Sequence, residues 1–275
     1  MKRIWLCADD YGIAPGVNNA ICDLIMRGRL NATSVMVLAP SFQRSAAVSL
    51  ATLNSDTVKA ALGLHLTLTA PFGPMSEHYG PLRDGQFLPL TTTLRSAMFR
   101  GLKPEKLAVE IETQIKAFAD AFGRPPDFID GHQHVHLFPQ IRDAVLAVAK
   151  ELAPNAWLRQ CGRARPLAGG LHDRKALVLD ILSLEFRRRA RRLGLRTNAA
   201  FAGTYDFTHG ADFPSLFPTF LNGLPDGGLV MCHPGIVDTE LQRLDPLTTL
   251  REAEYAFLGS DEFPKLLATQ GVTLA

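Results

Sequence analysis

Short apolar segments and amphipathic helical segments alternate along this chain from end to end, and that alternation limits the possible folds more than any other feature. Residues 3–8 predict a strand, because the residues after Arg3 form a continuous apolar run that is typical of a strand covered on both faces. A helix is predicted next, because Pro15 suits a first helical turn, Gly28 suits its end, and the apolar residues between them recur at helical spacing. Strands and helices that alternate in this way predict a parallel sheet with helices packed on it.

The same signals predict the remaining elements. We expect strands over residues 33–39, 61–68, 128–130, 156–160, 198–201, 228–232 and 272–275, and helices over 42–52, 107–122, 139–152, 174–194, 213–222, 246–258 and 262–269. Residues 70–90 are rich in proline and glycine and have no period, so they predict a long loop, which in compact domains is usually functional. With no Pro/Gly/Ser-rich linker, residues 1–275 predict a single parallel α/β domain of seven to eight strands. Eight strand–helix units would close a TIM-type barrel, and fewer would leave a distorted or open one.

The segment Asp130-Gly131-His132-Gln133-His134-Val135-His136 holds three of the chain's eight histidines and a carboxylate. Imidazole is the commonest metal ligand and the usual acid–base group near neutral pH. Because side chains alternate in an extended segment, we expect His132, His134 and His136 to share one face. Burying several imidazoles without a use is costly, so the segment indicates a metal site rather than hydrogen-bonded core histidines.

Further polar residues lie at the ends of other predicted strands. Asp9 and Asp10 end the first strand, His65 lies in the third, and His233 follows a late one. Each is a weak signal alone, since a double Asp is often a helix cap and a lone His in an apolar strand is often structural. Because active groups gather at the carboxyl ends of parallel strands, we expect these residues to meet His132 in one site.

Such a set suits hydrolysis at a metal ion. A hydrolytic metal needs two or three nitrogen or oxygen ligands from the protein and open positions for water and substrate, which one Asp and two His supply. A second carboxylate can accept the proton of the water, and a His on the opposite side can protonate the leaving group. The softness of these ligands suits zinc.

Other catalytic mechanisms lack their parts in this sequence. It has no Gly-x-Ser-x-Gly elbow, Walker loop, GxGxxG fingerprint or His-Glu-x-x-His helix. The four cysteines, Cys7, Cys22, Cys161 and Cys232, form no CxxC pair, which predicts reduced, buried thiols. Cys232 adjoins His233, but its apolar strand favours a core position over a nucleophile.

Charge and hydropathy narrow the partners and the location. A net charge of +2 argues against a dedicated nucleic-acid binder. The basic run at Arg187, Arg188, Arg189, Arg191 and Arg192 is interpreted as the solvated face of a helix that docks on its other side. The N-terminus lacks the apolar core of a signal peptide and no apolar run is long enough to span a membrane, so we expect a cytoplasmic protein. The oligomeric state stays open, with a homodimer as one alternative.

The polar motifs together resemble the YdjC-like carbohydrate deacetylase family, which includes chitooligosaccharide deacetylases and hopanoid-associated deacetylases. The matching segments are Ala8-Asp9-Asp10-Tyr11-Gly12, Gly63-Leu64-His65, residues 130–139 and Met231-Cys232-His233-Pro234. They occur in family order, and the long His segment is the specific one among them. Many relatives have Phe in place of Tyr11, and a chitooligosaccharide deacetylase typically has Ser-His-His over residues 131–133. Residues 160–226 match least, so substrate specificity is not carried over.

This resemblance implies a distorted (β/α) TIM-like barrel of the glycoside hydrolase/deacetylase type. It also implies a hydrolase that removes the acetyl group from an N-acetylated amino sugar or oligosaccharide. One divalent metal ion is expected, and magnesium is the ion often described for the family.

Positions that match the family's motifs receive roles by this resemblance: Asp10, His65 and His132 as metal ligands, Asp9 as the base and His233 as the acid. Three more are expected to bind substrate or to support the site: His134, His136 and Tyr11. Two alternatives stay open. A metal-dependent phosphoester hydrolase would need more carboxylates or a second ion, and a catalytically silent sugar-binding protein would not need Asp9.

Overall fold

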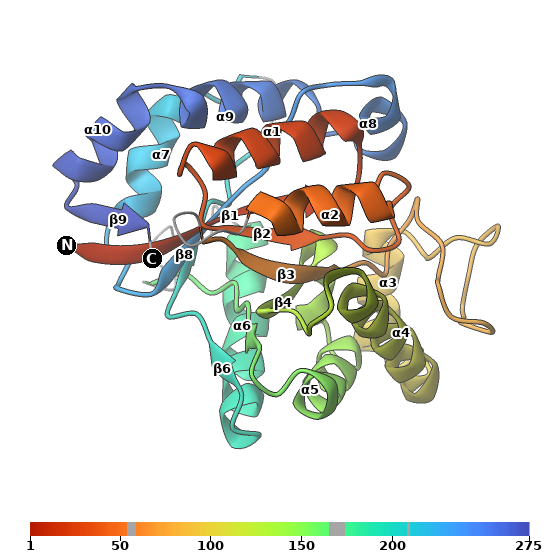
Figure 1. Cartoon of the computed structure of the whole chain (residues 1–275). Coiled ribbons are helices and arrows are strands. Elements are labelled where there is room, and N and C mark those ends of the chain that lie inside the picture. Colours follow the sequence, from red (N-terminus) through yellow and green to blue (C-terminus); the bar gives the residue numbers. More distant parts are fainter. Residues whose placement is uncertain (54–58, 165–173, 208–209, 275) are drawn as a thin grey trace.

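The computed structural model describes residues 1–53, 59–164, 174–207 and 210–274 and has one parallel sheet at its centre (Figure 1). The strands are β1 Lys2–Tyr11, β2 Ala32–Val35, β3 Ala61–Leu66, β4 Phe128–Gly131, β5 Trp157–Leu158, β6 Arg196–Thr197, β7 Phe201–Ala202, β8 Gly228–Cys232 and β9 Val272–Leu274. They lie in the order β6-β5-β4-β3-β2-β1-β8-β7, and β9 also pairs with β1. Among the described strands β6 and β7 stand at opposite ends of this order, so the sheet is a curled half-barrel that stays open. The predicted distorted parallel barrel is confirmed.

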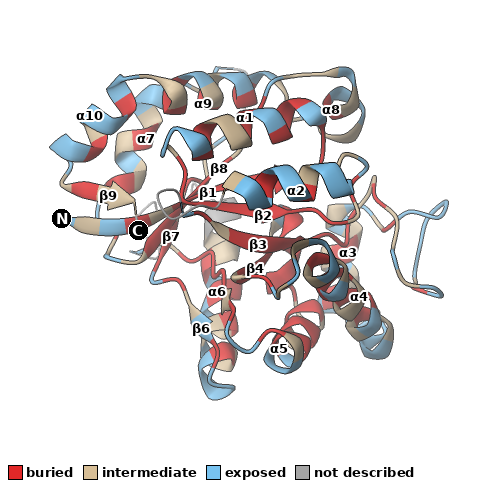
Figure 2. Ribbon diagram, viewed as in Figure 1, coloured by how far each residue is buried: buried red, intermediate tan, exposed pale blue. Residues whose placement is uncertain are grey.

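Helices cover this sheet, with buried faces turned inward and exposed faces outward (Figure 2). They are α1 Pro15–Met26, α2 Arg44–Leu53, α3 Leu90–Met98, α4 Pro104–Phe122, α5 Ile141–Leu152, α6 Arg174–Arg192, α7 Phe213–Leu221, α8 Thr239–Leu244, α9 Thr249–Gly259 and α10 Glu262–Thr269, with a 3-10 segment η1 at His132–Leu137. The predicted pattern of α4 is confirmed, because its apolar repeat is buried and Gly123 ends it with a left-handed backbone. No helix among the described residues has the length and apolar sequence that a membrane span requires.

The strand predicted over residues 198–201 is wrong. The structure has two short strands instead: β6 pairs with β5, and β7 pairs with β8. Asn198 lies between them, and its side chain forms hydrogen bonds with the backbone N and O of Gln160, at 2.8 and 3.1 Å. The side-chain amide thus takes the place of a neighbouring strand, and the sheet opens here.

Helices α3 and α8 were not predicted. Helix α3 contains three consecutive β-branched threonines, which favour strands over helices, so its local sequence gives a weak helix signal. Helix α8 has only six residues, and its Asp238 cap accepts a hydrogen bond from the N–H of Leu241 at 2.8 Å. Both helices therefore depend on tertiary packing and capping more than on a long apolar period.

The predicted long loop before α3 is confirmed, since its described residues form no helix and only an isolated bridge. Its aromatic residues Phe72, Tyr79 and Phe87 are buried, and the rings of Tyr79 and Phe87 pack edge to face with centroids 5.0 Å apart. These rings anchor the loop to the core.

The register of the sheet brings the predicted site residues to one edge. His65 of β3 is the direct partner of Asp130 of β4. Ala8 of β1, which precedes the double Asp, pairs with Thr33 on one side and with Cys232 on the other. Because all these strands are parallel, their carboxyl ends and the residues that follow them lie together.

Gly63 in β3 leaves room for the ring of Phe128 in β4. A Cβ at this position would lie 2.3 Å from Cε2 of Phe128, whose ring is itself stacked on Trp157 with centroids 4.4 Å apart. We expect Gly63→Ala to lower the free energy of unfolding by about 1–3 kcal/mol, because ring or strand must shift. Urea denaturation measures this. Gly101→Ala is the control, since its nearest contact would be an ordinary 3.5 Å; equal losses in both variants would contradict the explanation.

Candidate active site

A pocket of about 560 Å³ at the carboxyl ends of the strands holds the predicted site residues. Its polar part is formed at strand ends by Asp9, Asp10, His65, His132 and His233. The remainder is mostly an apolar wall, formed by Leu90, Leu94, Phe138, Val178, Leu179, Leu182, Phe207 and Leu247. Titratable groups from several strand ends thus share a pocket that is otherwise largely apolar.

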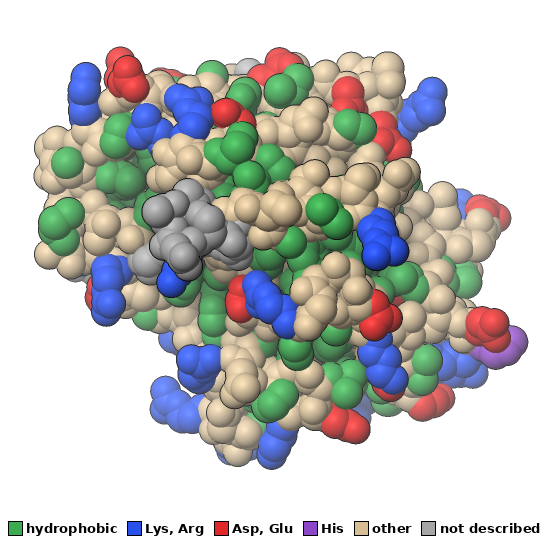
Figure 3. Space-filling model, in the orientation of Figure 1, with side chains coloured by type: hydrophobic (Ala, Val, Ile, Leu, Met, Phe, Trp, Pro, Cys, Tyr) green, Lys and Arg blue, Asp and Glu red, His purple; other side chains and the backbone are tan. Residues whose placement is uncertain are grey.

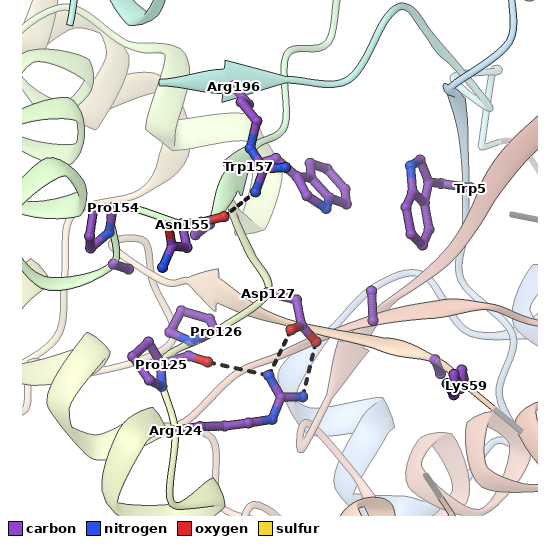
Figure 4. Close-up of a pocket in the computed structure, with 14 residues that line it drawn as sticks. Trp5, Lys59, Arg124, Pro125, Pro126, Asp127, Pro154, Asn155, Trp157 and Arg196 are labelled. Atoms are coloured by element: carbon purple, nitrogen blue, oxygen red, sulfur yellow. Dashed lines mark hydrogen bonds and ion pairs between the residues drawn. The ribbon is translucent and has the colours of Figure 1, made fainter. Parts of the chain in front are cut away.

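A larger hollow, of about 1080 Å³, opens at the amino ends of the strands (Figure 4). Trp5 and Trp157 lie on one side of it, and Arg124 holds Asp127 by two ion-pair contacts on the other. Its described lining contains no histidine, and its one carboxylate is already paired. Of these two cavities, the smaller one is therefore the one whose described lining combines histidines with several carboxylates.

Asp10, His65 and His132 meet in that pocket, and all three are buried. Oδ1 of Asp10 lies 3.0 Å from Nδ1 of His132 and 3.2 Å from Nε2 of His65. One possible ligand atom from each residue lies within 4.8 Å of the other two, so one cation could contact all three. The sequence predicted this meeting from strand ends alone.

His65 is held in one orientation by its second ring nitrogen. Nδ1 lies 2.7 Å from Oδ1 of Asp130 and 2.9 Å from Oγ of Ser34, which leaves Nε2 facing Asp10. Burial alone would lower the pKa of His65, but the charges of Asp130 and Asp9 raise it to about 10. The imidazole is therefore protonated at neutral pH in the metal-free protein.

A β-bulge directs the two aspartates of β1 into the site. The pairing of β1 with β2 shifts between Ala8 and Tyr11, and Asp10 has a positive φ of 70°. Adjacent side chains of a regular strand point to opposite faces, whereas a bulge re-aims one of them. Both Asp9 and Asp10 consequently line the same pocket.

The predicted extended alternation of His132, His134 and His136 is wrong. These residues form η1, in which Gln133 and His134 have left-handed backbone, because the chain must turn from β4 toward α5. His132 faces Asp10, whereas Nδ1 of His134 lies 3.5 Å from the sulfur of Cys161. His136 points into the core, and burial keeps its pKa well below the ordinary value.

His134 lines the pocket as a neutral group, because burial and the nearby charge of Arg159 lower its pKa to about 3. Nε2 of His136 donates a hydrogen bond to the backbone oxygen of Arg159 at 2.8 Å. His136 is therefore in a position to support the residue that holds Asp9.

Sequence patterns did not point to the two buried arginines of the site, Arg159 and Arg251. Arg159 is the one that holds Asp9. It is fully buried after β5 and donates to both oxygens of Asp9, at 2.6 and 2.7 Å. It also forms an ion pair of 2.6 Å with Oδ2 of Asp130. Burial alone would raise the pKa of Asp9, but the charge of Arg159 holds it well below the ordinary value. Asp9 is therefore an ionised, fixed carboxylate at neutral pH.

Arg251 of α9 is the buried cation that pairs with Asp10, as Arg159 pairs with Asp9. It is fully buried and lies 2.6 Å from Oδ2 of Asp10 and 2.6 Å from Oδ2 of Asp245. Burial alone would raise the pKa of Asp10, but Arg251 and His132 hold it well below the ordinary value. The two histidines contact one oxygen of Asp10 and the arginine contacts the other.

His233 lies at the end of β8, on the other side of β1 from His65 in the strand order. Its backbone N–H donates to Oε2 of the buried Glu254 at 2.5 Å, and the hydroxyl of Tyr205 donates to Oε1 of the same carboxylate at 2.6 Å. Nδ1 of His233 is buried without a hydrogen-bond partner among the described residues. The imidazole therefore lines the same pocket as Asp10, His65 and His132, with Nδ1 unpaired among the described residues.

Tyr11 lies outside this constellation, whereas two cysteines contact it. The sulfur of Cys7 accepts a hydrogen bond from Arg159 at 2.9 Å, and the sulfur of Cys161 lies near His134. The Tyr11 hydroxyl donates to the backbone oxygen of Ala46 at 2.8 Å, and the residue does not line the pocket. Cys232 is buried in β8, and burial raises the pKa of its thiol well above the ordinary value, so its predicted core position is confirmed. Cys7 and Cys161 are likewise free and buried, whereas Cys22 is half-buried.

Comparison with known proteins agrees with this arrangement. A family model described as "YdjC-like protein" matches residues 3–269. The chain belongs to the YdjC-like family. It is 32% identical over 261 residues to a chitooligosaccharide deacetylase of Klebsiella pneumoniae, covering 92% of each chain. It is 28% identical over 248 residues to the protein of the same name from Citrobacter koseri, covering 88% of this chain and 86% of the relative.

Two solved structures share the fold of this YdjC-like chain. An Enterococcus faecalis protein, described in terms of cellobiose-phosphate cleavage, superposes with a TM-score of 0.77 at 24% identity over 100% of this chain and 97% of its own. A peptidoglycan N-acetylglucosamine deacetylase superposes with a TM-score of 0.53 at 10% identity over 99% of this chain and 85% of its own. At these identities the likeness concerns the fold alone.

Replacing Arg159 tests how strongly the buried charges depend on one another. We expect Arg159→Met to lower the free energy of unfolding at pH 7 by about 3–5 kcal/mol, because Asp9 and Asp130 lose their buried cation. Arg189→Met is the matched control, since Arg189 also joins two carboxylates, Glu185 and Asp143, but at a surface where such pairs contribute about 1 kcal/mol or less. Chemical denaturation of both variants provides the comparison.

The difference between wild type and Arg159→Met is expected to shrink in acid. The folded-state pKa of Asp9 lies below its unfolded value of about 3.9, so its pairing stabilises the fold above that pH and is lost as the pH falls. A difference that stays constant down to pH 3, or a control that loses as much as the variant, would contradict this account.

Proposed function

We propose that this protein is a metal-dependent deacetylase that removes the acetyl group from an N-acetylated amino sugar or oligosaccharide. The names of the YdjC-like relatives support the substrate class. The observation that carries the proposal is the fixed, ionised carboxylate of Asp9 beside the cluster of Asp10, His65 and His132.

Asp10, His65 and His132 are the proposed metal ligands. Their donor set of one carboxylate oxygen and two imidazole nitrogens suits zinc, and magnesium is the alternative. Asp130 fits a supporting role, because a carboxylate on the far nitrogen of a ligating histidine fixes its tautomer and orientation. When bound, a divalent cation polarises the acetyl carbonyl and lowers the pKa of water. A bound ion would need neutral imidazole, so metal binding would compete with the proton that Asp130 and Asp9 stabilise on His65, whose pKa is about 10.

Asp9 is the proposed base that takes the proton of the attacking water. Its low pKa keeps it ionised at neutral pH but also makes it a weak base in bulk water. It therefore suits a water that has already been made more acidic. Arg159 fixes both of its oxygens, which limits the carboxylate to one orientation.

His233 is the proposed acid that protonates the departing amine. It lines the pocket across from His65, and Phe207 packs edge to face on its ring with centroids 5.5 Å apart. Glu254 holds its backbone rather than its ring, so Nδ1 has no partner among the described side chains. Asp9 would thus accept the proton of the attacking water, and His233 would donate a proton to the amine nitrogen as the C–N bond breaks.

Changing each of the two aspartates to asparagine is expected to affect a different property, turnover for Asp9 and metal affinity for Asp10. Asp9→Asn should bind metal like the wild type and lose acetate release from an N-acetylglucosamine oligomer by at least about 100-fold, because base catalysis is lost. Asp10→Asn should bind the metal ion more weakly than the wild type, and its loss of turnover should follow from that weaker binding. Calorimetry of metal binding and an acetate assay on chelated protein reloaded with zinc or magnesium separate the effects. Unchanged turnover in Asp9→Asn would end the proposed mechanism.

The same assay separates the alternatives. A phosphoester hydrolase would release phosphate rather than acetate, so the substrates include a phosphorylated disaccharide. A silent sugar-binding protein would bind the oligomer but release nothing, whichever ion is supplied.

Asp130→Asn tests the supporting role of Asp130 without removing a ligand. We expect a 10–100-fold weaker affinity for the ion, because the amide cannot hold His65 in the same charged hydrogen bond. Calorimetric titration measures it. Asp245→Asn is the matched control, since Asp245 contacts Arg251 and no proposed ligand directly, and a larger loss there would contradict the assignment.

A further inference from the structure

The outward face of α6 is apolar at the end of the helix that lies at the pocket. Val178, Ile181 and Leu184 recur at helical spacing and are 46%, 61% and 63% exposed. Leu182 and Phe186 on the other face are buried and pack the helix against the protein. The exposed apolar residues are therefore not needed for that packing. Single exposed apolar residues are common, but three along one helix face, of which Val178 lines the pocket, call for an explanation.

This apolar face continues into the pocket. Val178 lines the pocket itself, together with Leu179 and Leu182 of the same helix. The segment η1, which carries His132, packs against both α6 and α3. The surface of α6 and the candidate active site are therefore neighbours along one helix.

The outward face becomes basic toward the other end of α6. Arg188, Arg191 and Arg192 are exposed there, in the run that the sequence analysis interpreted as a solvated face. Arg188 has one long contact of 3.7 Å with Glu185, a carboxylate that Arg189 binds more closely. Figure 3 shows Lys and Arg side chains along the lower edge of the molecule, where α6 ends in Figure 1. The helix thus presents an apolar stretch followed by a cationic one.

Helix α3 repeats this combination on another wall of the pocket. Leu90 and Leu94 line the pocket, and Met98 continues the same helical spacing to the surface, where it is 55% exposed. Phe99, at the end of the helix, is 83% exposed. The exposed Arg95 and Arg100 flank these residues. Two helices that wall one pocket therefore both carry exposed apolar and basic side chains.

We propose that this mouth surface, formed by the exposed residues of α3 and α6, docks on an anionic lipid bilayer. Apolar side chains that enter the interface and arginines that contact anionic headgroups are the two components of reversible membrane attachment. The apolar residues alone would suit many partners, and the basic ones select a negatively charged surface. A second copy of the chain would bring like charges of the same arginines together. The bilayer is therefore the occupant that fits both components.

Vesicle co-sedimentation tests the proposal with the intact chain and no substrate. The wild type should bind phosphatidylcholine vesicles containing phosphatidylglycerol at least about tenfold more tightly than pure phosphatidylcholine, and the preference should fall as salt is raised. The double variant Ile181→Glu/Leu184→Glu should lose at least about tenfold in affinity for the anionic vesicles. The double variant Arg191→Gln/Arg192→Gln should lose affinity for the anionic vesicles by a similar factor. It removes positive charge and adds no charge to the apolar stretch.

Val48→Glu/Val109→Glu is the matched control. These valines are 53% and 50% exposed on α2 and α4, away from the pocket lining, and the double variant should bind vesicles like the wild type. Circular dichroism checks that each variant folds. If the glutamate variant does not fold, the arginine variant still tests the proposal.

Three outcomes overturn the proposal: no preference for anionic vesicles, equal loss in the control, or a wild-type dimer in light scattering that Ile181→Glu/Leu184→Glu dissolves without any effect on vesicles. Because acetate release is not measured, failure here leaves the proposed reaction untouched, and failure of the reaction leaves the docking untouched.

Discussion

The buried guanidinium of Arg159 is the interaction on which the rest of the site depends. It faces Asp9 and Asp130, two buried carboxylates that arrive on β1 and β4, and it supplies a positive charge that both share. Asp130 in turn holds His65, so one cation connects the proposed base to the orientation of a proposed ligand. His136 secures the backbone of Arg159 from the core side. A change in any of these linked side chains therefore affects the others through charge as well as through packing.

Much of the site could be predicted because strand ends follow from the apolar pattern. A continuous apolar run followed by polar residues marks both a strand and the edge where its last side chains emerge, and this was enough to bring Asp9, Asp10, His65, His132 and His233 together. The long helices could be predicted equally well, since an apolar repeat such as that of α4 fits an amphipathic helix and no strand. The half-barrel followed from the number of such repeats and from the resemblance to a family.

What the sequence did not reveal depends on contacts between distant residues. Arg159 stands at the end of a two-residue strand, and placing the end of that strand at residue 158 would have made it a strand-end candidate like the others. The turn in η1 could not be read from alternation, because left-handed residues at Gln133 and His134 arise from the need to reach α5. The gap at Asn198 is made by hydrogen bonds to Gln160, which leave no periodic trace.

The positive φ of Asp10 limits which side chain can occupy that position. Outside glycine, the left-handed region is tolerated best by short polar residues such as Asp and Asn, and it strains bulky or branched ones. A longer glutamate or a β-branched residue would pay a backbone penalty before making any contact, and glycine would offer no donor atom. The bulge in β1 thus restricts this corner of the pocket to a compact oxygen ligand. Backbone shape in this way narrows the residue types that could serve as the proposed ligand at position 10.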